Sequence, residues 1–534
     1  MTNVTVVGSG PSGVHFALTL LGKGHRVTLL DAGEGGPPPV RPDDDLRSLK
    51  ANLEDPVEYF LGADFESLIL PDSKEEFYGF PPNKMILFRR PPGAEVQADG
   101  LEPLLAYARG GLAEAWTAGV YPYDDADLGE FPIDHEDLLP YYGEVARRIG
   151  ITGRADDLSS FMPLHDHLEE TLDLDEHSQH LLETYVRRRR ALNRGLGVYV
   201  GHSRIAVLSR DRDGRRACAY LGRCLWGCPR RSLYTPSITL EECLAYPSFR
   251  YRPGLYVEAF RYGPDRRIEH VEARSLQDGQ RHEIPVETLV LSAGTLSSAR
   301  ILLESIRRQE GRAPRLSGLM DNRQVLIPFM NLRRLGRPES PRSYQYHQLC
   351  LGLVGDRGEP YVHGQITTLT TALVHPVIER IPMDLPAALS AFRQSRAALG
   401  VINVNLHDTR RSGNVVELGG DGDPRALRIS YRPPDDEPAR IRRVILRIKK
   451  ALHRLGCVVP PGGVHVRPMG ASVHYAGTLP MSSSPRELTT SIHGRSHDFQ
   501  NLYVVDGSTF PFLPAKNLTF TLMANAVRVA EEAF

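Results

Sequence analysis

Val4-Thr5-Val6-Val7-Gly8-Ser9-Gly10-Pro11-Ser12-Gly13 lies at the start of the chain and decides the fold of its first unit. A β-rich run precedes the glycines, a helix-like apolar run follows over residues 14–21, and a second strand-like run covers residues 26–31. This order of strand, glycine turn, helix and strand predicts a complete βαβ unit. The second strand ends on Asp31, 18 residues after Gly13.

The spacing G-x-G-x-x-G in this context indicates a dinucleotide site. Gly8 permits a tight turn, Gly10 lets the backbone approach a pyrophosphate, and Gly13 lets helix and strand pack closely. The helix N-terminus supplies unpaired N–H groups to phosphates, and a carboxylate at the end of the second strand can bind ribose hydroxyls. A βα turn without a ligand is the alternative, and the unit alone does not separate FAD from NAD. The residues predicted to bind the dinucleotide here are Gly8, Gly10, Pro11, Ser12, Gly13, Asp31 and Ala32.

Length and composition limit the class of protein. The 534 residues exceed the size at which single cores stop growing, about 250–300 residues, so we expect two domains. The 64 basic and 65 acidic residues nearly cancel, which gives no reason to expect a nucleic-acid partner. Six cysteines in a chain of this length do not make a disulfide scaffold.

The first residues bear on location. A strand that starts at Thr2 leaves no room for a signal peptide, and no apolar run has the length of a membrane span. We therefore expect a cytoplasmic protein without a membrane span.

Turn residues and charge mark the first half of the chain. A Pro/Gly-rich acidic stretch over residues 33–45 predicts an exposed loop, and residues 110–116 form a second glycine-marked loop. Residues 165–195 are helix-like and include four consecutive arginines, 187–190. We interpret the arginines as a solvated helical face rather than an anion or nucleic-acid site.

The second half alternates strands with two clear helices. Strand-like runs at 255–260 and 288–292 bracket a hairpin region, and a helix is expected from about 297 to 305. Residues 320–435 are β-rich, as in a domain built on a sheet. Residues 437–456 form an amphipathic helix, which we interpret as a domain-surface helix rather than a membrane-surface one.

Three motifs near the C-terminus identify a family. They are Val473-His474-Tyr475-Ala476-Gly477-Thr478-Leu479-Pro480-Met481, Asn501-Leu502-Tyr503-Val504-Val505-Asp506-Gly507-Ser508-Thr509-Phe510-Pro511 and Asn517-Leu518-Thr519-Phe520-Thr521-Leu522-Met523-Ala524. Their order and spacing resemble the glucose-methanol-choline (GMC) oxidoreductases. Further resemblances are Gly110-Gly111 with Trp116, Phe131-Pro132-Ile133 with Leu138-Leu139-Pro140-Tyr141-Tyr142, and Leu291-Ser292-Ala293-Gly294-Thr295-Leu296-Ser297-Ser298.

The resemblance implies an α/β fold in which an FAD-binding Rossmann-like domain is interleaved with an α+β substrate-binding domain on an antiparallel sheet. We expect residues 1–160, 195–310 and 465–534 in the FAD-binding domain and 311–464 in the substrate-binding domain. Residues 161–194 would be a helical excursion. The resemblance is weakest over about 311–460, where substrate identity would lie.

The resemblance also assigns roles. His474, whose imidazole can take a proton near neutral pH, would be the general base, and Asn517 would hold the substrate oxygen. A polar role for His474 and helix capping by Asn517 are the alternatives. The remaining residues expected at FAD are Gly111, Trp116, Thr117, Val257, Ala293, Gly294, Asp506, Gly507 and Thr519.

Some residues depart from the family pattern. Leu518 replaces a usual Pro, and Ser482 stands where Gly often follows the Met, which changes local loop shape. Ala115 precedes Trp116, where the similar loop of pyranose oxidases has a flavin-attaching His, so we predict non-covalent FAD.

The sequence holds one cysteine cluster, Cys218, Cys224 and Cys228. Its spacing is not that of a usual zinc or iron–sulfur site, and a similar run occurs in sterol oxidase-like and C-glycoside oxidase-like members of the family. We interpret the three as structural thiols and expect no metal.

The predicted function is FAD-dependent oxidation of an alcohol to a carbonyl on a sugar, glycoside or polyol, with oxygen or another electron acceptor. The lean toward sugars rests on residues 114–117, which resemble the pyranose oxidase and C-glycoside oxidase loop. The alternatives are an apolar alcohol such as a sterol, an NAD-dependent dehydrogenase, and a flavoprotein without redox turnover.

Overall fold

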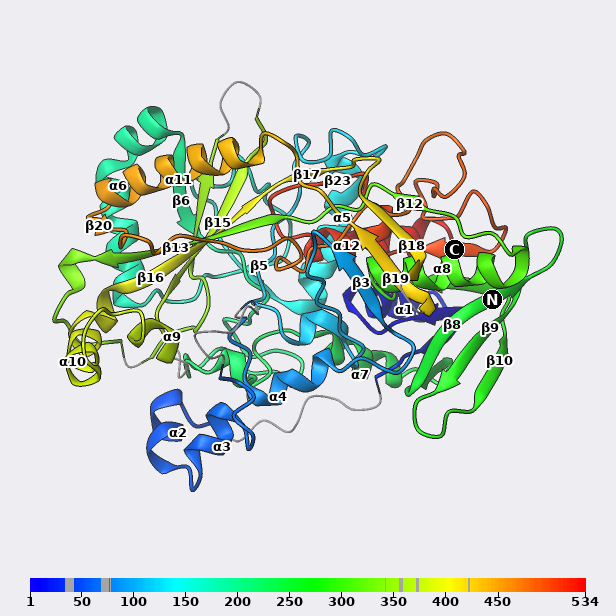
Figure 1. Ribbon diagram of the computed structural model, residues 1–534, viewed down its shortest axis with the longest axis horizontal. Coiled ribbons are helices and arrows are strands. Elements are labelled where there is room, and N and C mark those ends of the chain that lie inside the picture. The colour runs from blue at the N-terminus through cyan, green and yellow to red at the C-terminus, as the bar shows by residue number, and fades with distance from the viewer. Residues whose placement is uncertain are drawn as a thin grey trace.

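The structure is a computed structural model that describes residues 1–33, 43–68, 76, 78–340, 342–354, 359–370, 374–420 and 423–534. Most of the predicted loop at 33–45 lies outside the described residues. Figure 1 shows two regions: β13, β15 and β16 on the left, and both chain termini on the right. None of the helices in the described ranges combines the length and the apolar composition of a membrane-spanning segment.

The termini lie together because a parallel sheet takes strands from distant parts of the chain. Its order is β22-β11-β1-β2-β7, and every neighbouring pair is parallel. Val6 of β1 pairs with Leu29 of β2 on one side and Val290 of β11 on the other, and all three are buried. The strands are β1 (Asn3–Val7), β2 (Arg26–Leu30), β7 (Phe249–Arg252), β11 (Thr288–Leu291) and β22 (Leu502–Val504).

Two helices from opposite ends of the chain cover this sheet together. α1 (Pro11–Gly22) packs against α12 (Thr519–Glu532), and both share one apolar cluster with the strands. The predicted βαβ unit and the predicted terminal strand and helix are confirmed. The N-terminal and C-terminal segments of the chain therefore pack into one α/β layer structure.

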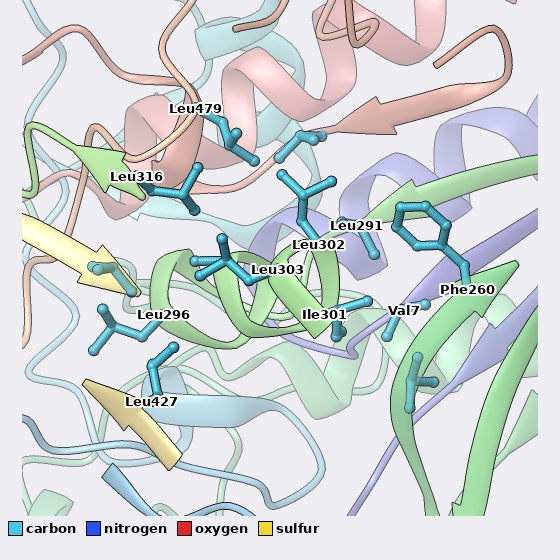
Figure 2. Close-up of a cluster of buried hydrophobic side chains, with 14 of the residues drawn as sticks. Val7, Phe260, Leu291, Leu296, Ile301, Leu302, Leu303, Leu316, Leu427 and Leu479 are labelled. Carbon is cyan, nitrogen blue, oxygen red and sulfur yellow. The ribbon is translucent and has the colours of Figure 1, made fainter. Parts of the chain in front are cut away.

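A second apolar cluster surrounds α8 (Thr295–Glu310), the helix predicted after β11. Figure 2 shows its side chains spreading to different neighbours: Ile301 lies toward Val7, and Leu303 lies near Leu316. The cluster also takes residues from a three-stranded hairpin sheet, β10-β9-β8, and a four-stranded sheet, β12-β18-β19-β3. The strands of these two sheets are β3 (Val96–Asp99), β8 (Leu255–Tyr262), β9 (Ile268–Ser275), β10 (Arg281–Pro285), β12 (Leu316–Ser317), β18 (Val415–Gly420) and β19 (Asp423–Ser430).

The left-hand region of Figure 1 is an antiparallel sheet of order β20-β13-β16-β15-β14-β6, with β21 also paired to β13. It confirms the β-rich character predicted for residues 320–435. Its strands are β6 (Val198–His202), β13 (Arg323–Asn331), β14 (Leu349–Leu353), β15 (Val362–Thr368), β16 (Leu399–Leu406), β20 (Cys457–Val458) and β21 (His465–Val466).

The two faces of this sheet differ, because side chains alternate along a strand. Residues such as Ile327, Ile402 and Val404 pack beneath α6 (Glu176–Leu196) and α11 (Glu437–Arg454). The opposite face carries polar residues and lines a cavity described below. Both helices were predicted, but α6 begins at Glu176 rather than near residue 165, because Asp175 caps its first turn. The arginines at 187–190 of α6 are exposed, as expected for a solvated face.

Segments without a firm prediction fold as short elements. Residues 46–105 contain α2 (Leu46–Asn52), α3 (Pro56–Leu61), α4 (Pro82–Met85) and β3. The remaining elements outside the short 3-10 turns are α5 (His135–Ile149), α7 (Pro236–Leu244), α9 (His375–Ile378), α10 (Leu385–Ser395), β4 (Ile151–Thr152), β5 (Leu168–Glu169), β17 (Asp408–Thr409) and β23 (Phe512–Leu513).

Strand pairing crosses the predicted domain division at several places, among them β6 and the β18–β19 hairpin. β6 was placed with the FAD-binding domain but pairs with β14 in the antiparallel sheet. The β18–β19 hairpin was placed with the substrate-binding domain but joins β3 and packs on α8. Both differences arise from long-range pairing, which local periodicity does not reveal. The domain boundaries as a whole stay a prediction.

Candidate functional site

A cavity of about 480 Å³ extends from the glycine turn after β1 to the polar face of the antiparallel sheet. This volume lies in the range of small-molecule and cofactor sites, about 300–1,000 Å³. Its walls include every residue predicted at the cofactor except Gly13: Gly8, Gly10, Pro11, Ser12, Asp31, Ala32, Gly111, Trp116, Thr117, Val257, Ala293, Gly294, Asp506, Gly507 and Thr519. His474 and Asn517 also line it.

The glycines of the turn have the three steric properties predicted for them. Gly8 has φ +102°, a conformation that favours glycine. A Cβ on Gly13 would lie 2.1 Å from the Gly8 carbonyl oxygen, so Gly13 allows α1 to pack on the turn rather than lining the cavity. A Cβ on Gly10 would meet nothing within 4 Å, because that position faces open space in the cavity. The first turn of α1 has no side-chain cap, so its N–H groups remain available to an anion.

Asp31 provides an acceptor at the same end of the cavity. Its Oδ1 accepts a hydrogen bond from the Gly33 N–H at 2.9 Å, and its buried Oδ2 has no hydrogen-bond partner among the described residues. Burial raises the pKa of Asp31 to about 7. A buried carboxylate oxygen without a donor is the group that a ribose hydroxyl would satisfy. The turn and Asp31 together fit the adenosine and pyrophosphate parts of a dinucleotide.

The second glycine loop lies against the first. The Gly110 N–H donates to the Ser9 hydroxyl at 2.8 Å, and a Cβ on Gly111 would come within 3.7 Å of the Gly10 Cα. Trp116 is fixed by a hydrogen bond from its indole N–H to the Tyr234 carbonyl at 2.8 Å. The loop therefore forms part of the cavity wall next to the glycine turn.

Asp506 joins two chain segments at the cavity wall. Its Oδ2 accepts from the Gly294 N–H at 3.0 Å and from the Ser298 hydroxyl at 2.5 Å, and its Oδ1 accepts from the Ser508 N–H at 3.0 Å. These bonds tie the turn after β22 to the start of α8. Its direct contact with a cofactor stays a prediction.

His474 lies at the opposite end of the cavity with its ring orientation fixed. Its Nδ1 is 3.0 Å from Asn322 Oδ1, and its backbone N–H donates to the Ser472 hydroxyl at 3.0 Å. Burial lowers the pKa of His474 to about 4, so the imidazole is neutral near neutral pH. A neutral imidazole can accept a proton, as a general base must.

Asn517 faces the same end of the cavity. Its Oδ1 accepts from Gln365 Nε2 and from Asn405 Nδ2, both at 3.4 Å. These two bonds fix the orientation of the amide, so its Nδ2 hydrogens are available to a group in the cavity. The N-cap of α12 is Leu518, which has no side-chain capping bond, so the structure does not support capping as the role of Asn517.

Three amides that the sequence analysis did not single out complete this end. Gln365 of β15 and Asn403 of β16 are directly paired across the sheet, and Gln324 of β13 lies on the same lining. The buried Oδ1 of Asn403 has no hydrogen-bond partner in the part of the chain that is described. The alternation in Val401-Ile402-Asn403-Val404-Asn405-Leu406 was the available signal, because it places polar residues on one face of a strand.

The three clustered cysteines lie beside the cavity wall rather than in it. All are free thiols, and burial raises the pKa of Cys218 to about 11. Within the described residues, the sulfur atoms of Cys218, Cys224 and Cys228 do not all lie within 4.8 Å of one another. Their interpretation as structural thiols stays a prediction.

Comparison with known proteins finds one family model and several relatives that match this chain. Residues 411–526 match the family model described as GMC oxidoreductase. The chain is 26% identical to the 2-methyl-1,2-propanediol dehydrogenase of Mycolicibacterium austroafricanum, over 99% of this chain and 94% of that protein. It is also 26% identical to the 6'''-hydroxyparomomycin C oxidase of Streptomyces lividus, over 76% of this chain and 72% of the relative.

Solved structures share the fold. Pyridoxine 4-oxidase from Mesorbium loti matches with a TM-score of 0.59 and 16% identity, over 100% of this chain and 99% of the other. Formate oxidase from Aspergillus oryzae matches with a TM-score of 0.65 and 12% identity, over 99% and 97% of the two chains. At these identities the likeness concerns the fold alone.

Proposed function

We propose that this chain, whose residues 411–526 match the GMC oxidoreductase family model, is an FAD-dependent enzyme that oxidises an alcohol group of a sugar, glycoside or related polyol to a carbonyl. One observation carries the proposal. His474 and Asn517 present an acceptor and a donor at one end of a cavity whose other end is the glycine turn. The two side chains are complementary to a hydroxyl group, which donates one hydrogen bond and accepts others.

The cavity fits FAD. Gly10 and the uncapped start of α1 would hold the pyrophosphate, and the unpartnered oxygen of Asp31 would hold a ribose hydroxyl. Bound FAD supplies a two-electron acceptor for the hydrogen on the alcohol carbon. Because the methyl side chain of Ala115 cannot bond to a flavin, we propose that FAD is held without a covalent bond.

The protein's part in the reaction is proton removal and orientation. His474 Nε2 takes the hydroxyl proton, while the Asn517 amide donates to the alcohol oxygen and holds it in line. Loss of this proton to His474 and of the carbon-bound hydride, which bound FAD would accept, would leave a carbonyl. The low pKa of His474, about 4, keeps the imidazole in its accepting form at neutral pH.

The amides favour a polyhydroxylated substrate over an apolar alcohol. Gln324, Gln365 and Asn403 line the cavity on the face opposite the apolar core of the antiparallel sheet. Burying the unpartnered Asn403 oxygen against a sterol would cost free energy, because its hydrogen bond would be unmet. A second hydroxyl of a sugar or polyol could bind the free Asn403 oxygen. The names of the relatives, for 2-methyl-1,2-propanediol and 6'''-hydroxyparomomycin C, are consistent with polar substrates.

Two points of the proposal do not depend on the cavity. We expect that oxygen or another electron acceptor re-oxidises the flavin. We also expect the protein to lie in the cytoplasm, and both expectations stay predictions.

Anaerobic mixing of the purified FAD-loaded enzyme with single alcohols tests the proposal. We expect flavin bleaching by members of a panel of methyl glucosides, free sugars and 2-methyl-1,2-propanediol, and none by cholesterol. Asn403→Leu should weaken binding of the sugar or polyol, whereas Asn501→Leu, which removes a buried amide away from the cavity, should not. Bleaching by cholesterol alone would support the apolar alternative.

A further inference from the structure

His474 is held by a segment that comes immediately before β13. Met320 and Ala476 exchange both backbone hydrogen bonds, at 2.9 and 3.1 Å. Asp321 accepts from the Gly470 N–H at 2.5 Å and from the Ser472 hydroxyl. Residues 320 and 321 therefore bind the backbone on both sides of His474.

The backbone held in this way is strained. Val473 has φ +57°, which is a genuine outlier for a β-branched residue. Such a conformation persists only where its surroundings over-determine it. The bonds from residues 320 and 321 supply that constraint, and they aim the side chain of His474 toward the next residue, Asn322.

The hydrogen bonds of Asn322 fix which of its atoms faces the imidazole. Its Nδ2 donates to the carbonyls of Leu406 at 3.0 Å and Pro514 at 2.9 Å. Both amide hydrogens are used, so the atom near His474 Nδ1 is the oxygen Oδ1, at 3.0 Å. An amide oxygen is only an acceptor, so Nδ1 must carry a hydrogen.

We propose that Asn322 is the positioning residue that holds His474 as the Nδ1-protonated tautomer and so keeps Nε2 free to take the hydroxyl proton of the substrate. The inference rests on the proposed function of His474. Asn322 is almost fully buried and does not line the cavity, so it acts through His474 and not by touching a substrate. The tautomer of a catalytic histidine is set by the partner of its other nitrogen.

The charged groups around His474 already have partners. Arg323 of β13 pairs with Glu437 at 2.7 Å, and Asp408 of β17 pairs with Arg411 at 2.7 Å. Lys516, next to Asn517, pairs with Asp124 at 3.3 Å and with Asp127.

Two further titratable groups of this region are Asp321 and His363. Asp321 is engaged by the Gly470 and Ser472 donors, and burial lowers the pKa of His363 on β15 well below its usual value. The neutral Asn322 oxygen is thus the direct partner that sets the ring state of His474.

Asn322→Asp and Asn322→Leu test the proposal. The carboxylate of Asn322→Asp should keep the Nδ1–H tautomer but raise the pKa of His474, moving the acidic limb of flavin reduction upward by about one pH unit or more. Asn322→Leu removes the acceptor, and the rate constant of flavin reduction should fall about 10- to 100-fold with little change in substrate affinity.

Asn501→Leu is the matched control. Its Nδ2 also donates to two backbone carbonyls, those of Ile268 at 2.9 Å and Glu287 at 2.7 Å, but it does not contact His474. It should lose comparable stability and keep the wild-type reduction rate per bound flavin. Equal rates in Asn322→Leu and Asn501→Leu would overturn the proposal.

A measurement without substrate completes the test. NMR of protein with ring-¹³C-labelled histidine distinguishes the two neutral tautomers, and the His474 signal is the one missing from His474→Gln. We expect the Nδ1–H tautomer in the wild type and in Asn322→Asp, and its partial or complete loss in Asn322→Leu. If Asn322→Leu does not fold, an unshifted pH limb in Asn322→Asp overturns the proposal.

The failures of the two proposals are distinguishable. Normal flavin reduction by methyl glucoside or 2-methyl-1,2-propanediol in His474→Gln would remove the base role and hence the proposed mechanism. A His474 signal in the Nε2–H form in the wild type would remove only the role of Asn322.

Discussion

Replacing Gly10 by alanine should separate the cofactor-binding role of the glycine turn from its folding role. Gly10 has φ −63° and ψ 177°, which alanine adopts readily, and its Cβ would meet nothing within 4 Å. The FAD-free protein should therefore keep its free energy of unfolding or gain about 0.4–1 kcal/mol. In the holoenzyme the same methyl group would occupy space that the pyrophosphate needs.

The expected loss of affinity follows from the cost of overpacking, about 1–3 kcal/mol. At 1.4 kcal/mol per factor of ten, the Kd for FAD should rise about 5- to 150-fold. Gly13→Ala should behave differently, because its Cβ would lie 2.1 Å from the Gly8 oxygen and 2.5 Å from Ser292 Oγ. It should destabilise the FAD-free fold as well as weaken FAD binding.

Gly22→Ala is the control from the same helix. Gly22 is exposed, and its Cβ would meet nothing within 4 Å. Titrating the apoprotein with FAD, followed by flavin fluorescence, gives each Kd, and urea denaturation of the apoprotein gives each free energy of unfolding. A wild-type Kd in Gly10→Ala, or a destabilised apoprotein, would refute the reasoning.

Three further results are expected. Asn517→Leu removes the donor to the substrate oxygen, so anaerobic flavin reduction should slow about 10²- to 10³-fold with FAD binding retained; an unchanged rate would exclude the donor role. Burial raises the pKa of Asp321 from 3.8 to about 7, so the native state prefers the protonated carboxyl and loses that stabilisation as pH rises from about 4 to 7. Urea unfolding across this window should show a flatter pH dependence for Asp321→Asn than for the wild type, and equal slopes would contradict the assignment. Denaturing the holoenzyme in guanidinium should release all flavin, because Ala115 cannot bond to it; flavin retained on the precipitated chain would contradict this.

Local sequence signals were sufficient for the parts of the site built by short motifs. Gly8, Gly10 and Gly13 have the steric environments expected from their spacing, because a βα turn is determined by adjacent residues. His474 and Asn517, which the C-terminal motifs brought together, line one cavity, and their catalytic roles stay predictions. The matches to a GMC oxidoreductase model and to oxidases and a dehydrogenase agree with the predicted family resemblance, FAD cofactor and action on CH–OH groups.

Residues that act through long-range contacts were not found in the sequence. Asn322 is 152 residues from His474 in the chain, and its role depends on how β13 meets the loop before His474. The same holds for β6, whose partner β14 lies about 150 residues further along. Pairing of such distant segments is decided by the packing of the whole chain and leaves no local periodicity.

Flavin reduction in His474→Ala tests the central claim most directly. The FAD-loaded variant and the wild type are mixed anaerobically with the sugar or polyol that bleaches the wild-type flavin, after flavin content and the absorption spectrum are matched. We predict that the wild type is reduced and that the variant is reduced at least about 100-fold more slowly, since general base catalysis contributes about 10²- to 10⁴-fold. Equal rates of reduction in the two proteins would contradict the assignment of His474 as the general base.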